Sequence, residues 1–167
     1  MPLGASEAFR RNVEAAVPAL RRYARALTRD RETAEDLVQD ALVRGLRSEH
    51  LFIGGDVRKW LYTILTNLNR NRLRTLSRRP LTLSIDDHDP SGAVPEGEMR
   101  DIERALAALS EDQRAALLLV VLEGLSYREV ADVLAIPIGT VMSRLARARV
   151  HVKAFLEGER PSLRQVK

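Results

Sequence analysis

The stretch that decides the fold is residues 123–149, EGLSYREVADVLAIPIGTVMSRLARAR. It contains one helical pattern, an interruption at residues 136–139 (IPIG), and a second helical pattern rich in arginine. Ser126 and Glu129 have the spacing of a capping box, in which each side chain satisfies a backbone N–H at a helix start. The interruption ends the first helix, and the second begins at about residues 138–140. A break this short predicts a helix-turn-helix.

The second of these helices has two distinct faces. At about 100° per residue, its apolar residues recur at steps of three and four and form one stripe. The stripe consists of Ile138, Val141, Leu145, Ala148, Val152 and Phe155. A different face carries Thr140, Ser143, Arg144, Arg147 and His151, with the hydroxyls nearest the helix start. Such a face suits a recognition helix in the major groove of DNA, whereas an isolated arginine-rich helix would more simply be a solvated surface. The capped helix, tight turn and basic helix, occurring in this order, favour DNA binding.

Composition favours an all-helical protein. The chain has 167 residues, only one Trp, three Tyr and three Phe, and no Cys. Sheets need more aromatic and β-branched residues than this. The longest apolar run is residues 115–122, well short of the roughly 20 residues that a membrane span requires. No secretory leader opens the sequence. We therefore expect a soluble cytoplasmic protein without membrane insertion.

Residues 77–97, SRRPLTLSIDDHDPSGAVPEG, are the natural linker, since they combine three prolines, two glycines and an Asp cluster without helical periodicity. The expected architecture is two small helical domains, 1–76 and 98–167, joined by this flexible linker, with the helix-turn-helix in the second. Apolar spacing predicts helices over residues 9–27, 33–46 and 57–76. Ser110 and Gln113 also have the spacing of a capping box, so capping signals predict further helix starts near residues 111 and 127.

Charge is sorted by segment. The formal net charge is +4, yet residues 57–79 contain seven Lys or Arg and no acid. Residues 138–167 contain another seven Lys or Arg against two acids. Two separate basic blocks indicate an anionic partner such as nucleic acid.

Residues 125–149 resemble region 4 of the bacterial extracytoplasmic-function sigma factors, whose pattern is S-x-x-E-I-A-x-x-L-x-x-x-x-G-T-V-x-S-R-x-x-R-A-R. By this resemblance, the residues facing the promoter −35 element are Thr140, Ser143, Arg144 and Arg147, with Arg149 as a DNA-backbone contact. The chain departs from the pattern at three positions. Met142 stands where Lys or Arg is usual, Ala135 where Gly is common, and Ala146 where a larger side chain is frequent.

Residues 34–44, AEDLVQDALVR, are similar to region 2.2 of the same family, the helix that docks on the clamp helices of RNA polymerase. The resemblance implies that core polymerase is bound by Asp36, Leu37, Gln39 and Asp40. On a helix, Leu37, Ala41 and Leu42 can face the core, and the polar members then offer acceptors to a basic surface.

Residues 57–74, VRKWLYTILTNLNRNRLR, resemble regions 2.3 and 2.4, which hold the melted −10 element. An apolar stripe of Leu61, Ile64, Leu65 and Leu68 is separate from a polar face. The resemblance implies −10 binding by Lys59, Asn67, Arg70, Asn71 and Arg74, with cations neutralising phosphates and the amides reaching a base edge. Trp60 is predicted to be a core residue rather than a stacking platform, and both roles stay open for Tyr62.

The resemblance implies an alternative sigma factor that binds core polymerase, directs promoter-specific initiation in a stress or signal response, and is held by an anti-sigma factor. No cofactor or metal is expected. Catalysis is disfavoured because His50, His88 and His151 are isolated from carboxylates at ligand spacing. Two rivals remain: a stand-alone helix-turn-helix regulator, and a sigma-like decoy that sequesters an anti-sigma factor.

Overall fold

The computed structural model describes residues 6–79 and 97–159, and among these residues all regular structure is helical. The first group of helices is α1 (Glu7–Thr28), α2 (Arg31–Arg47), the short 3₁₀ helix η1 (Glu49–Leu51) and α3 (Val57–Arg78). The second group is α4 (Glu98–Ala107), α5 (Glu111–Val121), α6 (Tyr127–Leu134) and α7 (Ile138–Glu159). The three predicted N-terminal helices and the three predicted helix starts are confirmed.

Side-chain caps begin most of these helices. Ser6, Asp30 and Asp56 accept hydrogen bonds from the first turns of α1, α2 and α3. Ser110 caps α5, and the predicted capping box at α6 is complete because Ser126 and Glu129 each accept from the other's backbone N–H. Only the Ser110 half of the box predicted at α5 forms, since the Gln113 side chain instead contacts His151. Local sequence therefore sets where the helices start.

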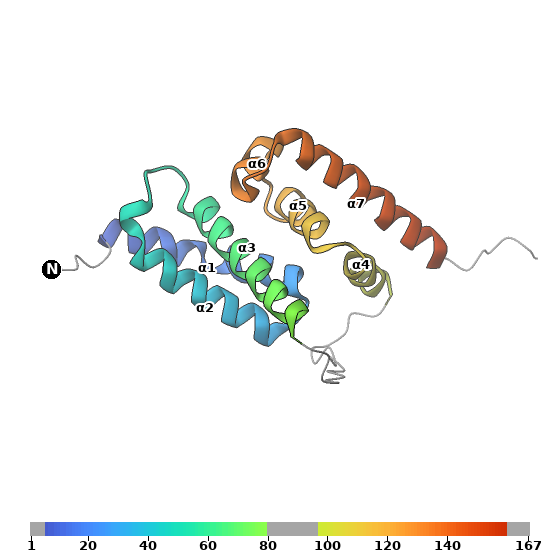
Figure 1. Cartoon of the computed structure of the whole chain (residues 1–167), viewed down its shortest axis with the longest axis horizontal. Helices are drawn as coiled ribbons and strands as arrows, with labels where there is room; N and C mark the ends of the chain where they lie inside the picture. Colours follow the sequence, from blue (N-terminus) through green and yellow to red (C-terminus); the bar gives the residue numbers. More distant parts are fainter. Residues whose placement is uncertain (1–5, 80–96, 160–167) are drawn as a thin grey trace, which may run out of the picture.

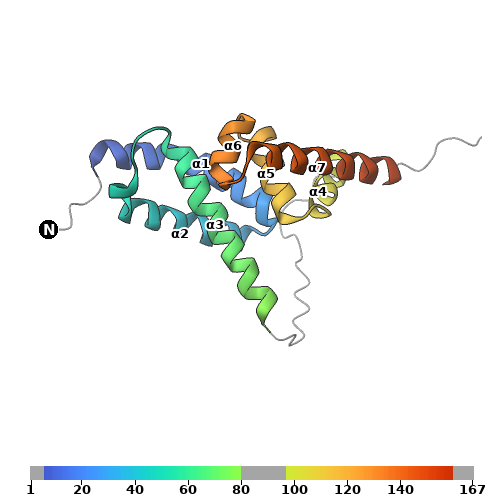
Figure 2. The same ribbon diagram turned by 45° about the horizontal axis from the view of Figure 1, so that its top comes forward.

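α1, α2 and α3 pack against one another, and α7 packs across α4, α5 and α6 (Figure 1). The two groups also touch, through α1 with α5 and α3 with α6. Their buried apolar residues form one contiguous cluster that extends from Phe9 to Leu145. α3 lies between the groups, and its C-terminal part projects beyond its neighbours (Figure 2). This position exposes one end of α3 and covers the other.

The predicted linker is only partly described. Ser77 and Arg78 belong to α3, which continues past the expected boundary at residue 76, and Gly97 directly precedes α4. Residues 80–96 lie outside the described residues, as do 1–5 and 160–167. α4 itself was not predicted, because its N-cap, Gly97, makes no side-chain cap hydrogen bond that a sequence pattern would reveal.

The turn between α6 and α7 carries backbone strain. Ala135 ends α6 with φ 52° and ψ 48°, in the left-handed region. A non-glycine residue in that region costs about 1–2 kcal/mol because its Cβ approaches the following carbonyl. Two backbone hydrogen bonds hold the turn, from Ala135 N to Asp132 O and from Ile136 N to Ala131 O. The helix-turn-helix geometry is kept in spite of the alanine.

Replacing Ala135 with glycine should raise the free energy of unfolding by about 1 kcal/mol, since glycine adopts positive φ without the steric cost. Thermal or urea unfolding of the full chain would measure the change. Ala146→Gly is the matched control, because Ala146 is exposed in the helical interior of α7 and glycine there should cost about 1 kcal/mol. Equal signs for the two changes would contradict the strain assigned to the turn.

Candidate polymerase and nucleic-acid interfaces

α2 presents an acidic, hydrogen-bonding surface. Asp36, Gln39 and Asp40 are exposed, as predicted for the polymerase-facing helix. Glu35 fixes the same helix to α1 through ion pairs with Arg21 at 3.3 Å and Arg25 at 3.0 Å. The hydrogen bond from Arg25 lowers the pKa of the Glu35 carboxyl. Arg21 and Arg25 therefore hold α2 in place by binding Glu35, and they do not bind the side-chain oxygens of Asp36, Gln39 and Asp40.

Leu37 differs from the other three predicted polymerase contacts. Its side chain is buried at 5% exposure in the core formed by α1, α2 and α3. A side chain this covered has little area to offer a partner. Leu37 therefore anchors α2 to its own domain, and its role as a polymerase contact stays a prediction.

The predicted −10 set on α3 is split by its surroundings. Asn67, Asn71 and Arg74 are exposed. Lys59 and Arg70 are partly buried and paired with acids of the second helix group. The predicted apolar stripe packs as expected, with Leu61 and Leu65 fully buried and Ile64 and Leu68 packed at its edge. Thus Asn67, Asn71 and Arg74 are open to solvent, whereas Lys59 and Arg70 are bound by carboxylates of the second helix group.

The predicted −35 set on α7 is similarly mixed. Ser143 and Arg147 are exposed, and Arg147 makes no hydrogen bond or ion pair with any residue the structure describes. Arg149 donates to the Tyr127 hydroxyl at 3.0 Å, which joins α7 to α6. Thr140 is half-buried at the start of α7, and Arg144 pairs with Asp112 of α5 at 3.5 Å. Arg147 is the cation of this set that is most available to a ligand.

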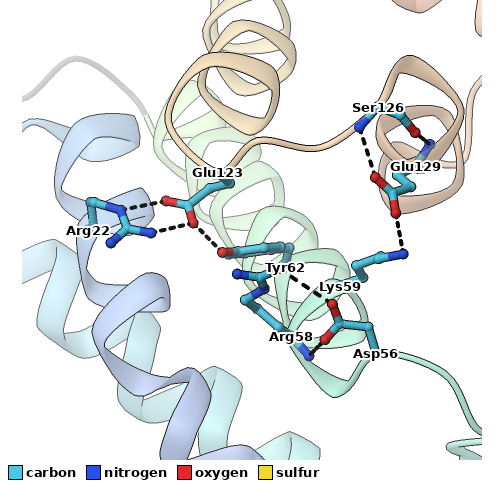
Figure 3. Close-up of polar contacts among 8 residues, drawn as sticks. All are labelled: Arg22, Asp56, Arg58, Lys59, Tyr62, Glu123, Ser126 and Glu129. Atoms are coloured by element: carbon cyan, nitrogen blue, oxygen red, sulfur yellow. Dashed lines mark hydrogen bonds and ion pairs between the residues drawn. The ribbon is translucent and has the colours of Figure 1, made fainter.

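A buried polar cluster joins the two helix groups, and no sequence pattern predicts it. Glu123, in the loop after α5, has a side chain with 0% exposure. Arg22 of α1 donates to it through Nε at 3.0 Å and Nη2 at 2.8 Å, and the Tyr62 hydroxyl of α3 also donates to it (Figure 3). The hydrogen bond to Glu123 raises the pKa of Arg22, and burial raises that of Tyr62. Gly124, with φ 70°, turns the chain out of α5 directly after this carboxylate.

A second contact between the groups joins Lys59 of α3 to Glu129 of α6 (Figure 3). Glu129 accepts from Lys59 through one oxygen and from the backbone N–H of Ser126 through the other, at 2.8 Å. The Lys59 hydrogen bond, followed by that of Ser126, lowers the pKa of Glu129 to about 2. The capping box therefore also fixes the direction in which this carboxylate meets α3.

Other polar residues tie the groups together. Arg114 donates to the Leu27 carbonyl at the end of α1 at 3.1 Å, and to the carbonyls of Leu106, Ala107 and Leu109 around the end of α4. Burial lowers the pKa of its guanidinium. Asn69, 1% exposed, donates to Glu111 at 3.4 Å. The sequence pattern does not reveal the contacts between the groups, since Arg114 and Leu27 are 87 positions apart and Asn69 and Glu111 are 42 apart.

Trp60 and Tyr62 now have assigned environments. Trp60 packs against Phe9 and Phe52, with ring centroids 5.9 and 5.4 Å away, so its predicted packing role is confirmed, although the ring is partly exposed. Tyr62, left open by the sequence, is fully buried and stacks edge-on against Tyr23 at 5.3 Å. Neither side chain is a freely exposed stacking platform.

Neither a metal centre nor a membrane span is found in the part of the chain described. Across residues 6–79 and 97–159, no group of three or more His, Cys, Asp or Glu is placed to hold a metal ion. Among the same residues, every helix falls short of the length and apolarity needed to cross a bilayer.

Three helices that expose acidic, amide and basic side chains are followed by a helix-turn-helix, which is the arrangement that the resemblance to sigma factors implies. The family described as "Sigma-70, region 4" matches residues 99–152, and that described as "Sigma2 domain of PhyR" matches residues 13–66. Each match falls on one of the two helix groups.

The chain belongs to the family of extracytoplasmic-function (ECF) RNA polymerase sigma factors. It is 36% identical over 166 residues to "ECF RNA polymerase sigma factor EcfG" of Rhodopseudomonas palustris, covering 93% of this chain and 88% of that one. It is 36% identical over 131 residues to "ECF RNA polymerase sigma-E factor" of Escherichia coli, covering 68% and 69% of the two chains.

A solved structure shares the arrangement. It is the sigma factor RpoE in complex with the anti-sigma factor NepR from Bartonella quintana, with a TM-score of 0.76, 31% identity, and coverage of 93% of this chain and 100% of that one. A complex of PhyR with NepR from Sphingomonas, at 21% identity and TM-score 0.68, shares the fold alone.

Proposed function

We propose that this protein binds core RNA polymerase through α2 and directs it to promoters by holding the −10 element on α3 and the −35 element on α7. The observation that carries the proposal is the placement of two exposed polar surfaces, around Asn67 and around Arg147, on separate helices of a sigma-family fold. Residues 1–76 and 98–167 would be the region 2 and region 4 domains.

The assignment of individual residues follows their exposure. For polymerase it retains Asp36, Gln39 and Asp40, which offer acceptors to a basic surface. For the −10 element it uses Asn67, Asn71 and Arg74, joined by Lys59 and Arg70 once these are released. For the −35 element it uses Thr140, Ser143, Arg144 and Arg147, with Arg149 toward the DNA backbone. Binding free energy rather than covalent chemistry supplies the action.

Control by an anti-sigma factor in the cytoplasm is part of the proposal. It is supported by the Bartonella relative, whose structure contains the anti-sigma factor NepR. The decoy function is less well supported. The N-terminal match carries the name of PhyR, and the PhyR of a solved complex from Bartonella quintana is an anti-anti-sigma factor. However, the R. palustris relative that spans both helix groups is a sigma factor. A stand-alone regulator would have no use for the acidic surface of α2.

Reconstitution tests the function. Core bacterial polymerase should select promoter fragments from genomic DNA, and transcribe them in run-off assays, only when this protein is present. A folded protein that binds core polymerase without supporting any transcript would favour the decoy. One that binds DNA fragments without polymerase would favour the stand-alone regulator.

Arg147→Ala should weaken recognition of the selected −35 element by about 1–3 kcal/mol, because an arginine that reads a base edge contributes about that much discrimination. Footprinting with holoenzyme at fixed salt would measure it. Arg100→Ala is the control, since Arg100 is also exposed but lies on α4, outside the helix-turn-helix. An unchanged −35 footprint would exclude Arg147 from base recognition.

A further inference from the structure

An exposed apolar row runs along α7. It consists of Ile138, Met142, Ala146 and Val150, which recur at steps of four, so that each lies one helical turn from the next. All four are exposed, and none belongs to the buried apolar cluster, which α7 joins through Val141 and Leu145. Single exposed apolar residues are ordinary, but several in a row on one helix mark a surface that can meet a partner.

The exposed face of α7 is shifted from the face that the sequence pattern indicates. Thr140 is half-buried, and Arg144 is partly buried and pairs with a carboxylate of α5. The face that is exposed instead consists of Met142, Ser143, Ala146 and Arg147. Met142 and Arg147 lie at its two edges, since successive residues are about 100° apart around a helix. Apolar and polar side chains therefore share one open face.

The charge of α7 indicates which partner this face meets. Residues 138–156 contain four Lys or Arg and no acid. Arg147 makes no hydrogen bond or ion pair with any residue that the structure describes. An anionic partner that also offers apolar groups would match both features. Duplex DNA is such a partner, because each thymine presents a 5-methyl group in the major groove between the phosphates of the two strands.

Met142 differs chemically from the Lys or Arg that is usual at this position of the family pattern. A cation donates hydrogen bonds to phosphate or to the O6 and N7 acceptors of guanine. A thioether donates none, but its long unbranched chain adapts to an apolar surface. Ala146, one turn further along α7, is too small to cover Met142, which is 50% exposed. Met142 therefore suits a methyl group better than a polar base edge.

We propose that Met142 is a specificity-determining residue, which packs against the 5-methyl group of a thymine in the −35 element and so selects an A·T pair at that position. The proposal rests on the assignment of α7 as the helix that reads the −35 element. Burial of one methyl group corresponds to about fourfold in affinity, so its removal can be measured while the other contacts stay in place.

Replacing thymine with deoxyuridine removes this methyl group and keeps every hydrogen-bonding group of the base. After the wild-type holoenzyme has selected a promoter, competition with duplexes in which each −35 thymine is replaced in turn measures the affinity. We expect about fourfold weaker binding of the wild type at one thymine. Met142→Ala should bind the thymine duplex about that much more weakly, and should lose no further affinity on replacement. Met142→Leu, which keeps a large apolar side chain, should restore the sensitivity to replacement.

Two further variants make the test specific. Met99→Ala is the matched control, because Met99 is 53% exposed but lies on α4, outside the helix-turn-helix. It should distinguish thymine from deoxyuridine as the wild type does. Met142→Arg should shift the selected pair from A·T to G·C, since arginine binds guanine in the major groove. All variants should unfold at the urea concentration of the wild type, because neither methionine belongs to the buried apolar cluster.

Equal sensitivity to deoxyuridine in the wild type and Met142→Ala would overturn the proposal, as would a −35 element without thymine on either strand. Unchanged promoter selection by Met142→Arg would likewise exclude Met142 from base recognition, and would favour a protein partner for the apolar row. In each case the wild-type holoenzyme would still transcribe from selected promoters. Failure of that transcription assay would instead remove the proposed function on which the inference rests.

Discussion

Tyr23→Ala is expected to lower the free energy of unfolding by about 3–5 kcal/mol, the range for truncating a large aromatic residue in a packed core. Tyr23 has 0% exposure at the centre of the N-terminal helices and packs edge-on against Tyr62, with ring centroids 5.3 Å apart. Alanine would leave a cavity between α1 and α3 that the surrounding helices can fill only in part. Urea or guanidinium unfolding of the full chain would measure the loss.

Tyr23→Phe distinguishes packing from hydrogen bonding. The Tyr23 hydroxyl lies 2.9 Å from the Thr66 hydroxyl, and Thr66 is 1% exposed. Removing only this oxygen leaves Thr66 without that partner, for a cost of about 1–3 kcal/mol. Arg11→Ala is the surface control, because its ion pair with Glu7 is exposed and such pairs contribute about 0–1 kcal/mol. Equal losses in Tyr23→Ala and Arg11→Ala would contradict the assigned core.

The helices could be predicted because their signals are local. Ser110 and Ser126 cap helices at the expected positions, and Leu61 and Leu65 are buried as their spacing indicates. α4 was not predicted because Gly97, its N-cap residue, has no side chain that could cap the helix. The start of a helix can be predicted from a sequence when a side chain caps it, and it is harder to predict when the cap residue has no such side chain.

The interface between the helix groups could not be predicted from periodicity. Arg22 and Glu123 are separated by 101 positions, and Lys59 and Glu129 by 70. No local pattern in the sequence indicates these pairings, since which charged residues meet is a property of the assembled fold. The same packing explains why Tyr62 and Asn69 are buried on a face of α3 that the apolar stripe does not include. α3 packs against α1 and α2 on one side and against α6 on another, whereas a single apolar stripe describes only one of these contacts.

The surroundings of the predicted site residues depend on whether the second helix group covers them. Where a helix faces only solvent on its polar side, the expected residues are exposed, as for Asp36 and Asp40 on α2 and Asn67 on α3. Where the second helix group covers α3, Lys59 and Arg70 have acidic partners. The resemblance predicts which residues contact DNA, whereas the structure gives the partners of these residues in the free chain.

Reversing two charges on α2 should have the largest effect on activity. Asp36→Arg combined with Asp40→Arg replaces two exposed carboxylates, one helical turn apart, with cations. If α2 meets a basic polymerase surface, attraction becomes like-charge repulsion, which costs several kcal/mol at an interface. We expect the affinity for core polymerase to fall at least about 100-fold, and run-off transcription to fall with it.

Glu14→Arg combined with Glu103→Arg is the matched control, because it changes the net charge equally at exposed positions on α1 and α4. The two double variants should unfold at similar denaturant concentrations, since neither pair of acids has a hydrogen-bond or ion-pair partner in the described part of the chain. Fluorescence anisotropy of labelled protein titrated with core polymerase measures the affinities. Similar affinities for the two variants would exclude α2 as the electrostatic docking surface. A selective loss in the α2 variant would place that surface at the carboxylates, because net charge and folding would be the same in both proteins.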